Sequence, residues 1–292
     1  MVYMSNTEWL LASEAYLRVS LFACFFLALA WAEGKWFWRV RESWRMGRWG
    51  RHLALTATSK VLIRLTFPVL LLQTAVQAAK DHQGILNHLN MPYVLKVVIA
   101  IFVLDLFIYL QHRLMHRFKW LWALHKVHHV DKELDVSTGI RFHPLEELFS
   151  MAIKILAVAF LGAPVWAVFI FEVVLNFGAL FTHTNISLNK YWEAKLRWFI
   201  VTPDMHRIHH SDIPLDYNTN FGFCLSVWDR LFKTYRPKAF TGEKQIIFGQ
   251  EAYRDAKYQT ILHMLLLPLN LRSMRPVKKR QRKIQMSAQD EP

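Results

Sequence analysis

Residues 91–129 read MPYVLKVVIAIFVLDLFIYLQHRLMHRFKWLWALHKVHH, an apolar run that leads directly into five histidines. Its first part, residues 91–110, has roughly the 20 apolar residues that a helix needs to cross a bilayer core. On a helix, residues four positions apart share a face, so His112 and His116 project together. The stretch therefore predicts a membrane-spanning helix that carries candidate metal ligands at its end.

Three further stretches have the apolar character of membrane helices. Residues 17–32 form the first, and residues 61–79 form the second, which is weakened by Arg64 and kinked by Pro68. Residues 148–181 are too many for one crossing, and Gly162-Ala163-Pro164 in their middle predicts two short helices that form a hairpin. We therefore expect an all-α integral membrane protein with about four transmembrane helices, this hairpin included.

Positive charge is unevenly distributed among the connecting segments. Segments 35–51 and 113–147 each carry six lysines or arginines, whereas segment 80–90 carries only Lys80. Because basic segments remain on the cytoplasmic side, the pattern predicts an N-terminus outside and the histidines inside. We expect a multi-pass protein of a bacterial inner membrane, with a cytosolic helical cap that holds the histidines. A soluble helical protein with very apolar core helices is the alternative.

Composition narrows the classes of protein further. The chain has 292 residues, 53% of them apolar, and a net charge of +14. Its two cysteines, Cys24 and Cys224, provide neither a disulfide scaffold nor a cysteine metal site. The basic run at 272–283 could contact nucleic-acid phosphates, but beside membrane helices, attraction to anionic lipid headgroups is the simpler explanation. We therefore expect the bilayer as a partner and no nucleic acid.

Histidine is unusually frequent, with 14 copies, ten of them between positions 112 and 210. The candidate ligands are a pair, two H-x-x-H-H triplets and a single residue, namely His112, His116, His125, His128, His129, His183, His206, His209 and His210. His143 is a tenth candidate. Neutral imidazole suits iron, zinc, copper and nickel, and this number of ligands exceeds one four-coordinate site. It fits two metal ions, and two irons could together supply the electrons that split O₂.

Asp105 and Tyr109 precede the first histidine pair at helical spacing. An acidic residue inside a membrane helix raises the free energy of the protein in the bilayer, so its presence there suggests a functional role. We interpret Asp105 as a residue that orients an imidazole N–H or an arginine, with an interhelical hydrogen bond as an equal alternative. A metal transporter, or a metal-binding protein without redox chemistry, is the alternative function. A transporter would need ligands near the bilayer midplane, whereas these cluster at helix ends.

Several motifs in residues 105–235 resemble the fatty acid hydroxylase/sterol desaturase superfamily of membrane di-iron oxygenases. They are D-x-x-x-Y-x-x-H-R-x-x-H at 105–116, H-K-V-H-H at 125–129, R-F-H-P-L-E at 141–146, T-H-T-N at 182–185, P-D-M-H-R-I-H-H-S at 203–211, N-F-G at 220–222 and W-D-R-L-F-K-T-Y at 228–235. The resemblance implies that the nine histidines are the metal ligands and that no separate catalytic residue is needed.

Some positions in these motifs need a separate interpretation. Ser187 stands where fatty-acid 2-hydroxylases have a further histidine, and Asn185 could hold a water in its place. Lys233 stands where many relatives have glycine. We expect Asn220 and Asp229 to form hydrogen bonds around the ligands.

The resemblance also implies a reaction, in which two non-haem irons and O₂ as co-substrate attack a C–H bond of a membrane lipid. Hydroxylation and desaturation, and sterol-like, fatty acyl or other lipids, all remain open. Electrons are expected from a ferredoxin or a small haem protein with its reductase, because the chain has no flavin, haem or Fe–S signature. We divide the chain into N-terminal membrane helices with a basic interfacial loop (1–100), a catalytic domain (101–240) and an amphipathic, basic tail (241–292).

Overall fold

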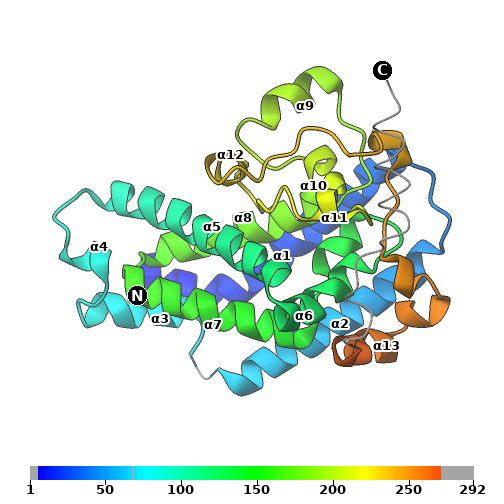
Figure 1. The fold of residues 1–292 in the computed structure, drawn as a ribbon. Helices are drawn as coiled ribbons and strands as arrows, with labels where there is room; N and C mark the ends of the chain where they lie inside the picture. The colour runs from blue at the N-terminus through cyan, green and yellow to red at the C-terminus, as the bar shows by residue number, and fades with distance from the viewer. Residues whose placement is uncertain (1–5, 68, 271–292) are drawn as a thin grey trace.

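The computed structural model describes residues 6–67 and 69–270 and is built from helices (Figure 1). The long bundle contains α1 (Asn6–Lys35), α2 (Arg45–Thr66), α3 (Leu71–Lys80), α4 (Ile85–His88), α5 (Tyr93–Arg117), α7 (Pro144–Leu161) and α8 (Val165–Thr182). The cap contains α6 (Lys119–His129), η1 (Val136–Ile140), α9 (Lys190–Leu196), α10 (Pro203–His209), α11 (Pro214–Tyr217), α12 (Val227–Leu231), η2 (Glu243–Gln245), η3 (Glu251–Tyr253), η4 (Ala256–Gln259), α13 (Ile261–Leu266) and η5 (Leu267–Leu269). The described residues form isolated β-bridges but no strand, so the all-α prediction is confirmed.

Four helical regions are long and apolar enough to cross a membrane. They are Glu8–Lys35, Arg45–His88, Tyr93–Arg117 and Val165–Thr182. These regions contain or overlap the stretches predicted from the sequence, so the expectation of about four membrane helices is confirmed. The first arm of the hairpin, α7, lies outside this set and carries three charged residues, Glu146, Glu147 and Lys154.

The second apolar stretch is divided into two helices near Pro68. Helix α2 ends at Thr66, and α3 begins at Leu71. Between them, Phe67 is extended, with φ −108° and ψ 108°. A residue before proline is pushed out of the helical region by the proline ring, which accounts for the break.

The predicted hairpin of α7 and α8 turns at Gly162, whose φ is +63°. A second glycine with positive φ, Gly84, lies against this turn, and a Cβ on Gly84 would lie only 2.1 Å from the backbone nitrogen of Gly162. Glycine is therefore required at both positions by conformation and by close backbone contact. Helices α3 and α5 each pack against both arms of the hairpin.

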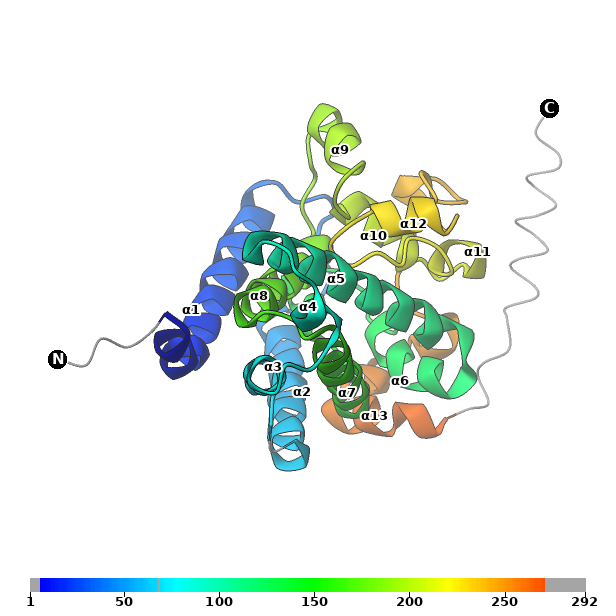
Figure 2. The same ribbon diagram turned by 90° about the vertical axis from the view of Figure 1, so that its left-hand side faces the viewer.

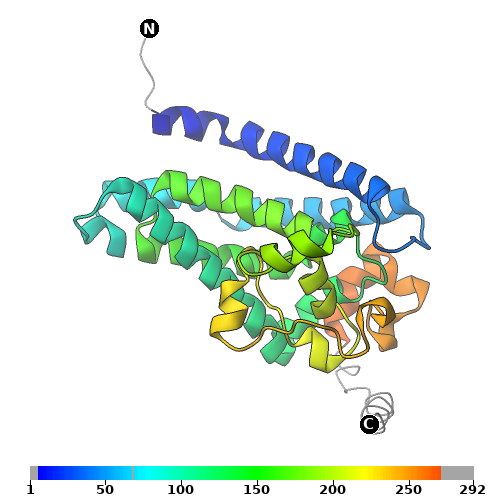
Figure 3. The ribbon, with the colours of Figure 1, turned by 90° about the horizontal axis from the view of Figure 1, so that it is seen from above.

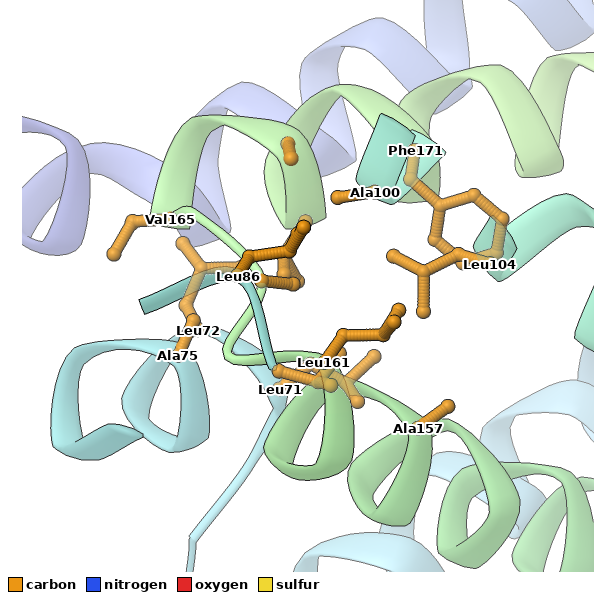
Figure 4. Packing of buried hydrophobic residues seen from close by; sticks show 14 of the residues in the cluster. Leu71, Leu72, Ala75, Leu86, Ala100, Leu104, Ala157, Leu161, Val165 and Phe171 are labelled. Atoms are coloured by element: carbon orange, nitrogen blue, oxygen red, sulfur yellow. The ribbon is translucent and has the colours of Figure 1, made fainter. Parts of the chain in front are cut away.

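Apolar side chains fill the space between these helices (Figure 4). Leu72 comes from α3, Leu104 from α5, Leu161 from α7 and Phe171 from α8, and each is at most 5% exposed. Full burial of such a side chain contributes about 1.5–3 kcal/mol. Helix α1 runs along one side of the bundle, where it contacts α8 (Figure 3).

Both basic segments lie at the same end of the bundle as the cap. Arg48 at the start of α2 donates to the carboxylate of Asp131, at 2.6 and 2.9 Å. Glu33 at the end of α1 accepts from the backbone nitrogens of Val136, at 2.7 Å, and Asn185, at 2.9 Å. Segments 35–51 and 113–147 thus share one end, as the charge pattern requires.

The part of the C-terminal segment that the structure describes packs back onto the cap. Met264 and Leu267 form a buried cluster with Leu55 of α2 and Val127 of α6. Helix α13 accordingly lies beside α2 and α6 (Figure 2). The basic run at 272–283 lies outside the described residues.

Candidate metal centre

Nine histidines gather where the bundle meets the cap. They are supplied by the C-terminal end of α5 (His112, His116), by α6 (His125, His128, His129), by the C-cap of α8 (His183), and by α10 and its C-cap (His206, His209, His210). The start of α10 is fixed by Thr202, whose hydroxyl accepts from the backbone nitrogen of Met205, and by Pro203 in the first turn. Helix ends and caps therefore position every candidate ligand.

The nine imidazoles form two groups. The first contains His112, His116, His125, His129 and His209, and the second contains His128, His183, His206 and His210. Within each group, one nitrogen from every ring lies within 4.8 Å of the others. The groups adjoin, because the stacked rings of His129 and His210 belong to different groups and have centroids 4.5 Å apart.

Each H-x-x-H-H triplet contributes to both groups. The outer two histidines of a triplet are four residues apart and share a helix face, so they enter the same group. The middle histidine points to the other group, so His128 of α6 joins the outer pair of α10, and His209 of α10 joins the outer pair of α6. The two triplets therefore interlock across the centre.

Backbone carbonyls determine the tautomer of three rings. A carbonyl oxygen can only accept, so the imidazole nitrogen that faces it must carry the proton. The contacts are His112 Nδ1 to Phe221 O at 2.7 Å, His183 Nδ1 to Ala179 O at 2.6 Å and His209 Nδ1 to Thr219 O at 2.8 Å. The lone pair of each ring is therefore on Nε2, free to bind a metal ion.

A fourth ring is held by a carboxylate that we did not predict as part of the site. Glu146, in the first turn of α7, lies 2.5 Å from Nδ1 of His125 through its Oε1. Burial raises the pKa of Glu146 to about 8 and lowers the pKa of His125 to about 3. Glu146 ends the R-F-H-P-L-E motif three residues after His143, and this spacing was the available signal.

Burial also keeps the other rings of the cap neutral. It lowers the pKa of His183 to about 4, and it lowers the pKa of His128 and His210 well below the usual value. Metal ions bind the neutral form of imidazole, so a set of rings that resists protonation is prepared for them.

The distances between the nitrogens within the two groups are those expected of ligands around a metal ion. In the second group, Nε2 of His183 lies 2.9 Å from Nε2 of both His128 and His206, and 3.1 Å from that of His210. Neighbouring ligands of an octahedral ion, each about 2.1 Å from the metal, would be about 3.0 Å apart. In the first group, both nitrogens of His116 and His129 are buried without a hydrogen-bond partner among the residues that the structure describes. All-imidazole sets suit iron, copper, zinc or nickel rather than calcium or magnesium.

Aromatic rings enclose the two groups. Phe142 stacks on His128, with centroids 4.5 Å apart. Trp122 stacks on Tyr217 and lies 4.8 Å from His116 and 5.2 Å from His129, centroid to centroid. These apolar faces limit the access of water to the nitrogens.

The predicted loop residues hold the chain around His112. Asp229 accepts from the backbone nitrogens of Phe221 and Gly222, both at 2.8 Å. The carbonyl of the same Phe221 faces Nδ1 of His112, so Asp229 positions this ring through one peptide unit. Asn220, at φ +54°, donates to the carbonyl of Met205 in α10.

Tyr109 and Asp105 link α5 to the segment that contains α12. The Tyr109 hydroxyl lies 2.8 Å from the Thr234 hydroxyl, which in turn donates to Asp229. Asp105 accepts from the indole nitrogen of Trp228 at 2.8 Å and contacts no imidazole in the hydrogen bonds of the described residues. The alternative of a hydrogen bond between helices therefore describes Asp105 better than the imidazole-orienting role.

Asn185 and His143 do not lie among the grouped nitrogens. The Asn185 side chain donates to the carbonyl of Arg39 at 2.7 Å and accepts from its nitrogen at 3.1 Å, which joins the cap to the loop after α1. His143 is the N-cap of α7 and accepts from the backbone nitrogen of Leu145 at 3.2 Å. Neither residue is in a position to complete the second group, which keeps four nitrogens.

The family model for fatty acid hydroxylases matches residues 97–234, a range that contains all nine grouped histidines. This region of the chain belongs to the fatty acid hydroxylase superfamily. Ornithine lipid hydroxylase OlsE of Rhizobium tropici is 31% identical over 173 residues, which are 59% of this chain and 51% of that protein. Alkylglycerol monooxygenase of Xenopus tropicalis is 28% identical over 47% of this chain and 29% of its own length. The enzyme of the same name from Danio rerio is 30% identical over 52% and 32%, respectively.

The similarity to these relatives covers between 47% and 59% of this chain. The matched region spans about half, or less, of the length of each relative. No solved structure matches the chain.

Proposed function

We propose that this protein is an O₂-dependent di-iron enzyme that hydroxylates a C–H bond of a membrane lipid. The observation that carries the proposal is the pair of adjoining groups of five and four imidazole nitrogens, placed where apolar helices end. Bound iron would supply the electrons that split O₂ and the oxidising power that attacks the C–H bond.

The residues of the chain have separate tasks in this proposal. The nine histidines would hold the two ions, and the hydrogen bonds at Nδ1 of His112, His125, His183 and His209 would leave Nε2 of these rings available to them. Phe142 and Trp122 exclude water, which protects a reactive centre from side reactions. The apolar helices keep the site next to the bilayer, from which a lipid would enter.

The names of the relatives support a lipid as substrate and hydroxylation as the reaction. One is named for an ornithine lipid and the other for alkylglycerols, and both names describe the addition of oxygen. We therefore favour hydroxylation over desaturation, with the substrate class given as a polar lipid that carries a long chain.

Two further features belong to this proposal. Electrons come from a separate donor, a ferredoxin or a small haem protein with its reductase, and the basic balance of +14 favours an acidic donor. The histidine end faces the cytoplasm, in a bacterial inner membrane. A periplasmic reporter fused after Lys126 should be inactive, and an active fusion at this position would reverse the orientation.

Iron content and oxygen uptake test the proposal together. The purified protein should hold about two irons, and the reduced protein should consume O₂ only when a suitable lipid is added, with a product heavier by one oxygen atom. Substitutions His128→Ala and His209→Ala should each lower the iron content, whereas substitution of the exposed His88 of α4, His88→Ala, should not. Iron that survives both losses would contradict the assigned ligands, and bound iron without lipid-dependent O₂ uptake would favour metal binding or transport.

A further inference from the structure

A second site lies beside the cap, outside the histidine groups. An open cavity of about 600 Å³ is lined by residues of the loop at 39–43, the start of α2, and the segments 132–134 and 247–259. None of the nine grouped histidines lines it. Its volume is within the range of about 300–1,000 Å³ that is typical of small-molecule sites.

The lining of the cavity is rich in positive charge. The cations are Arg39, Arg41, Arg48, Arg51, Lys132 and Arg254, and the acids are Glu42 and Glu133. Most small-molecule pockets are lined mainly by apolar groups. A lining with this excess of cations is unsuited to a lipid chain and fits an anionic group.

Half of these cations already have a carboxylate partner. The pairs are Arg48 with Asp131 at 2.6 Å, Arg41 with Glu33 at 3.2 Å and Arg254 with Asp212 at 3.2 Å. In each pair a carboxylate offsets the positive charge, although Glu33 is shared between Arg41 and Arg45, so these three cations shape the cavity more than they attract a ligand.

The other half, Arg39, Arg51 and Lys132, have no carboxylate within 4.0 Å in the described part of the chain. Arg39 donates to the carbonyls of Lys244 and Ile246, both at 3.0 Å, and Lys132 donates to the carbonyl of Arg254 at 3.1 Å. The half-buried Arg51 makes no hydrogen bond or ion pair among the residues that the structure describes. Three cations in one cavity are thus left with unbalanced charge.

The two acids of the lining cancel only part of this charge. Glu133 accepts from the backbone nitrogens of Glu42 and Ser43 and from the Ser43 hydroxyl, but these neutral donors leave its negative charge in place. Glu42 is exposed. Arg39, Arg51 and Lys132 against these two carboxylates leave a surplus of about one positive charge, which favours an anionic ligand such as a phosphate group.

The start of α2 adds to the attraction. This helix has 22 residues, and its N-cap, Trp44, provides no side-chain hydrogen bond to the first turn. Uncapped backbone N–H groups and the positive end of the helix dipole favour an anion at this end. Ser43 and Arg48, on either side of this end, both line the cavity.

We propose that this cavity binds the phosphate group of an anionic ligand, through Arg39, Arg51 and Lys132. A lipid headgroup and a soluble phosphate compound share this chemistry. The exposed Trp36 and Trp44 near the cavity suit the headgroup level of a bilayer. An acidic protein partner fits less well, because a protein contact needs a broad surface of about 1,000 Å² rather than a concave site of this volume.

Calorimetric titration of the purified full-length protein in neutral detergent tests the proposal. The probes are dihexanoyl phosphatidic acid, dihexanoyl phosphatidylcholine and inorganic phosphate. We expect phosphatidic acid to bind, with at least tenfold weaker binding in the double variant Arg51→Gln/Lys132→Gln, and phosphatidylcholine not to bind. Lys238→Gln removes an exposed cation outside the cavity and should leave the affinity unchanged.

A second variant keeps the test valid if the double variant fails to fold. Glu42→Gln removes the unbalanced acid and should tighten the binding of phosphatidic acid several-fold. Binding of inorganic phosphate at the same site would support a soluble ligand, and binding of phosphatidic acid alone would support a headgroup. Absence of binding by both phosphatidic acid and inorganic phosphate, or equal affinity in wild type and double variant, would overturn the proposal.

Discussion

Glu146 offers the sharpest test of how the chain prepares its imidazoles. The substitution Glu146→Ala removes the oxygen that lies 2.5 Å from Nδ1 of His125. The Glu146 side chain is only 6% exposed, so water cannot easily replace the lost carboxylate. His125 would then have an unsatisfied N–H and no fixed orientation toward the first group.

The size of the effect follows from this one contact. Leaving a buried donor without its hydrogen-bond partner costs about 1–3 kcal/mol. At 1.4 kcal/mol for each tenfold change, the dissociation constant of the ion in the first group should rise about 5- to 150-fold. The second group contains no partner of Glu146, so its ion should be retained.

The measurement is iron retention against increasing chelator. Glu146→Ala should lose about half of its iron at a chelator concentration that leaves the wild type intact, and Glu146→Gln, which keeps an acceptor oxygen, should fall between them. Glu147→Ala is the matched control, because Glu147 is the next residue in α7 but pairs with Lys60 at 2.8 Å, away from the imidazoles. Identical retention curves for Glu146→Ala and Glu147→Ala would refute the reasoning.

Three further predictions concern stability and the tenth ligand candidate. Lys233 has φ +58°, so Lys233→Gly should stabilise the fold by about 0.5–1 kcal/mol and raise Tm in detergent; a lower Tm would argue against backbone strain. His143 caps α7, so His143→Asn should leave the iron content unchanged, and loss of an ion would make His143 a ligand. Burial of Asp131 is outweighed by Arg48 and Arg141, which hold its pKa well below the usual value. Asp131→Ala should therefore destabilise by about 3–5 kcal/mol at pH 7. The difference from wild type should shrink as pH falls below the unfolded pKa of about 4, and a pH-independent difference would exclude the ion pairs as its cause.

The spacing of residues within single helices was sufficient to predict most of the membrane helices and the candidate ligands. It identified the membrane helices, the hairpin at Gly162 and the nine histidines that gather at one end, and at Pro68 it predicted a kink where the structure has a break between two helices. All of these follow from local rules of helix periodicity, length and backbone restriction. The division of each triplet between two groups did not follow, because it depends on how α6 and α10 face each other across the centre.

Contacts between distant segments were harder to predict. Glu146 and His125 are on different helices, and nothing in their separation of 21 residues indicates a contact at 2.5 Å. From the sequence, Asp105 could form a hydrogen bond with any polar group near it in the bundle. In the structure it accepts from the Trp228 indole and not from an imidazole. The positive φ of Lys233 gives a physical reason for glycine in relatives that the sequence itself could not supply.

The interlocked triplets give the two halves of the centre different requirements for assembly. Helix α10 and its C-cap supply one of the five histidines of the first group but two of the four histidines of the second group. A nascent chain with α10 still detached would already present four converging rings on one side and only two on the other. The order of the segments along the chain thus implies an order of metal binding. The first group could bind its ion before α10 packs against the cap, whereas the second group could bind its ion only afterwards.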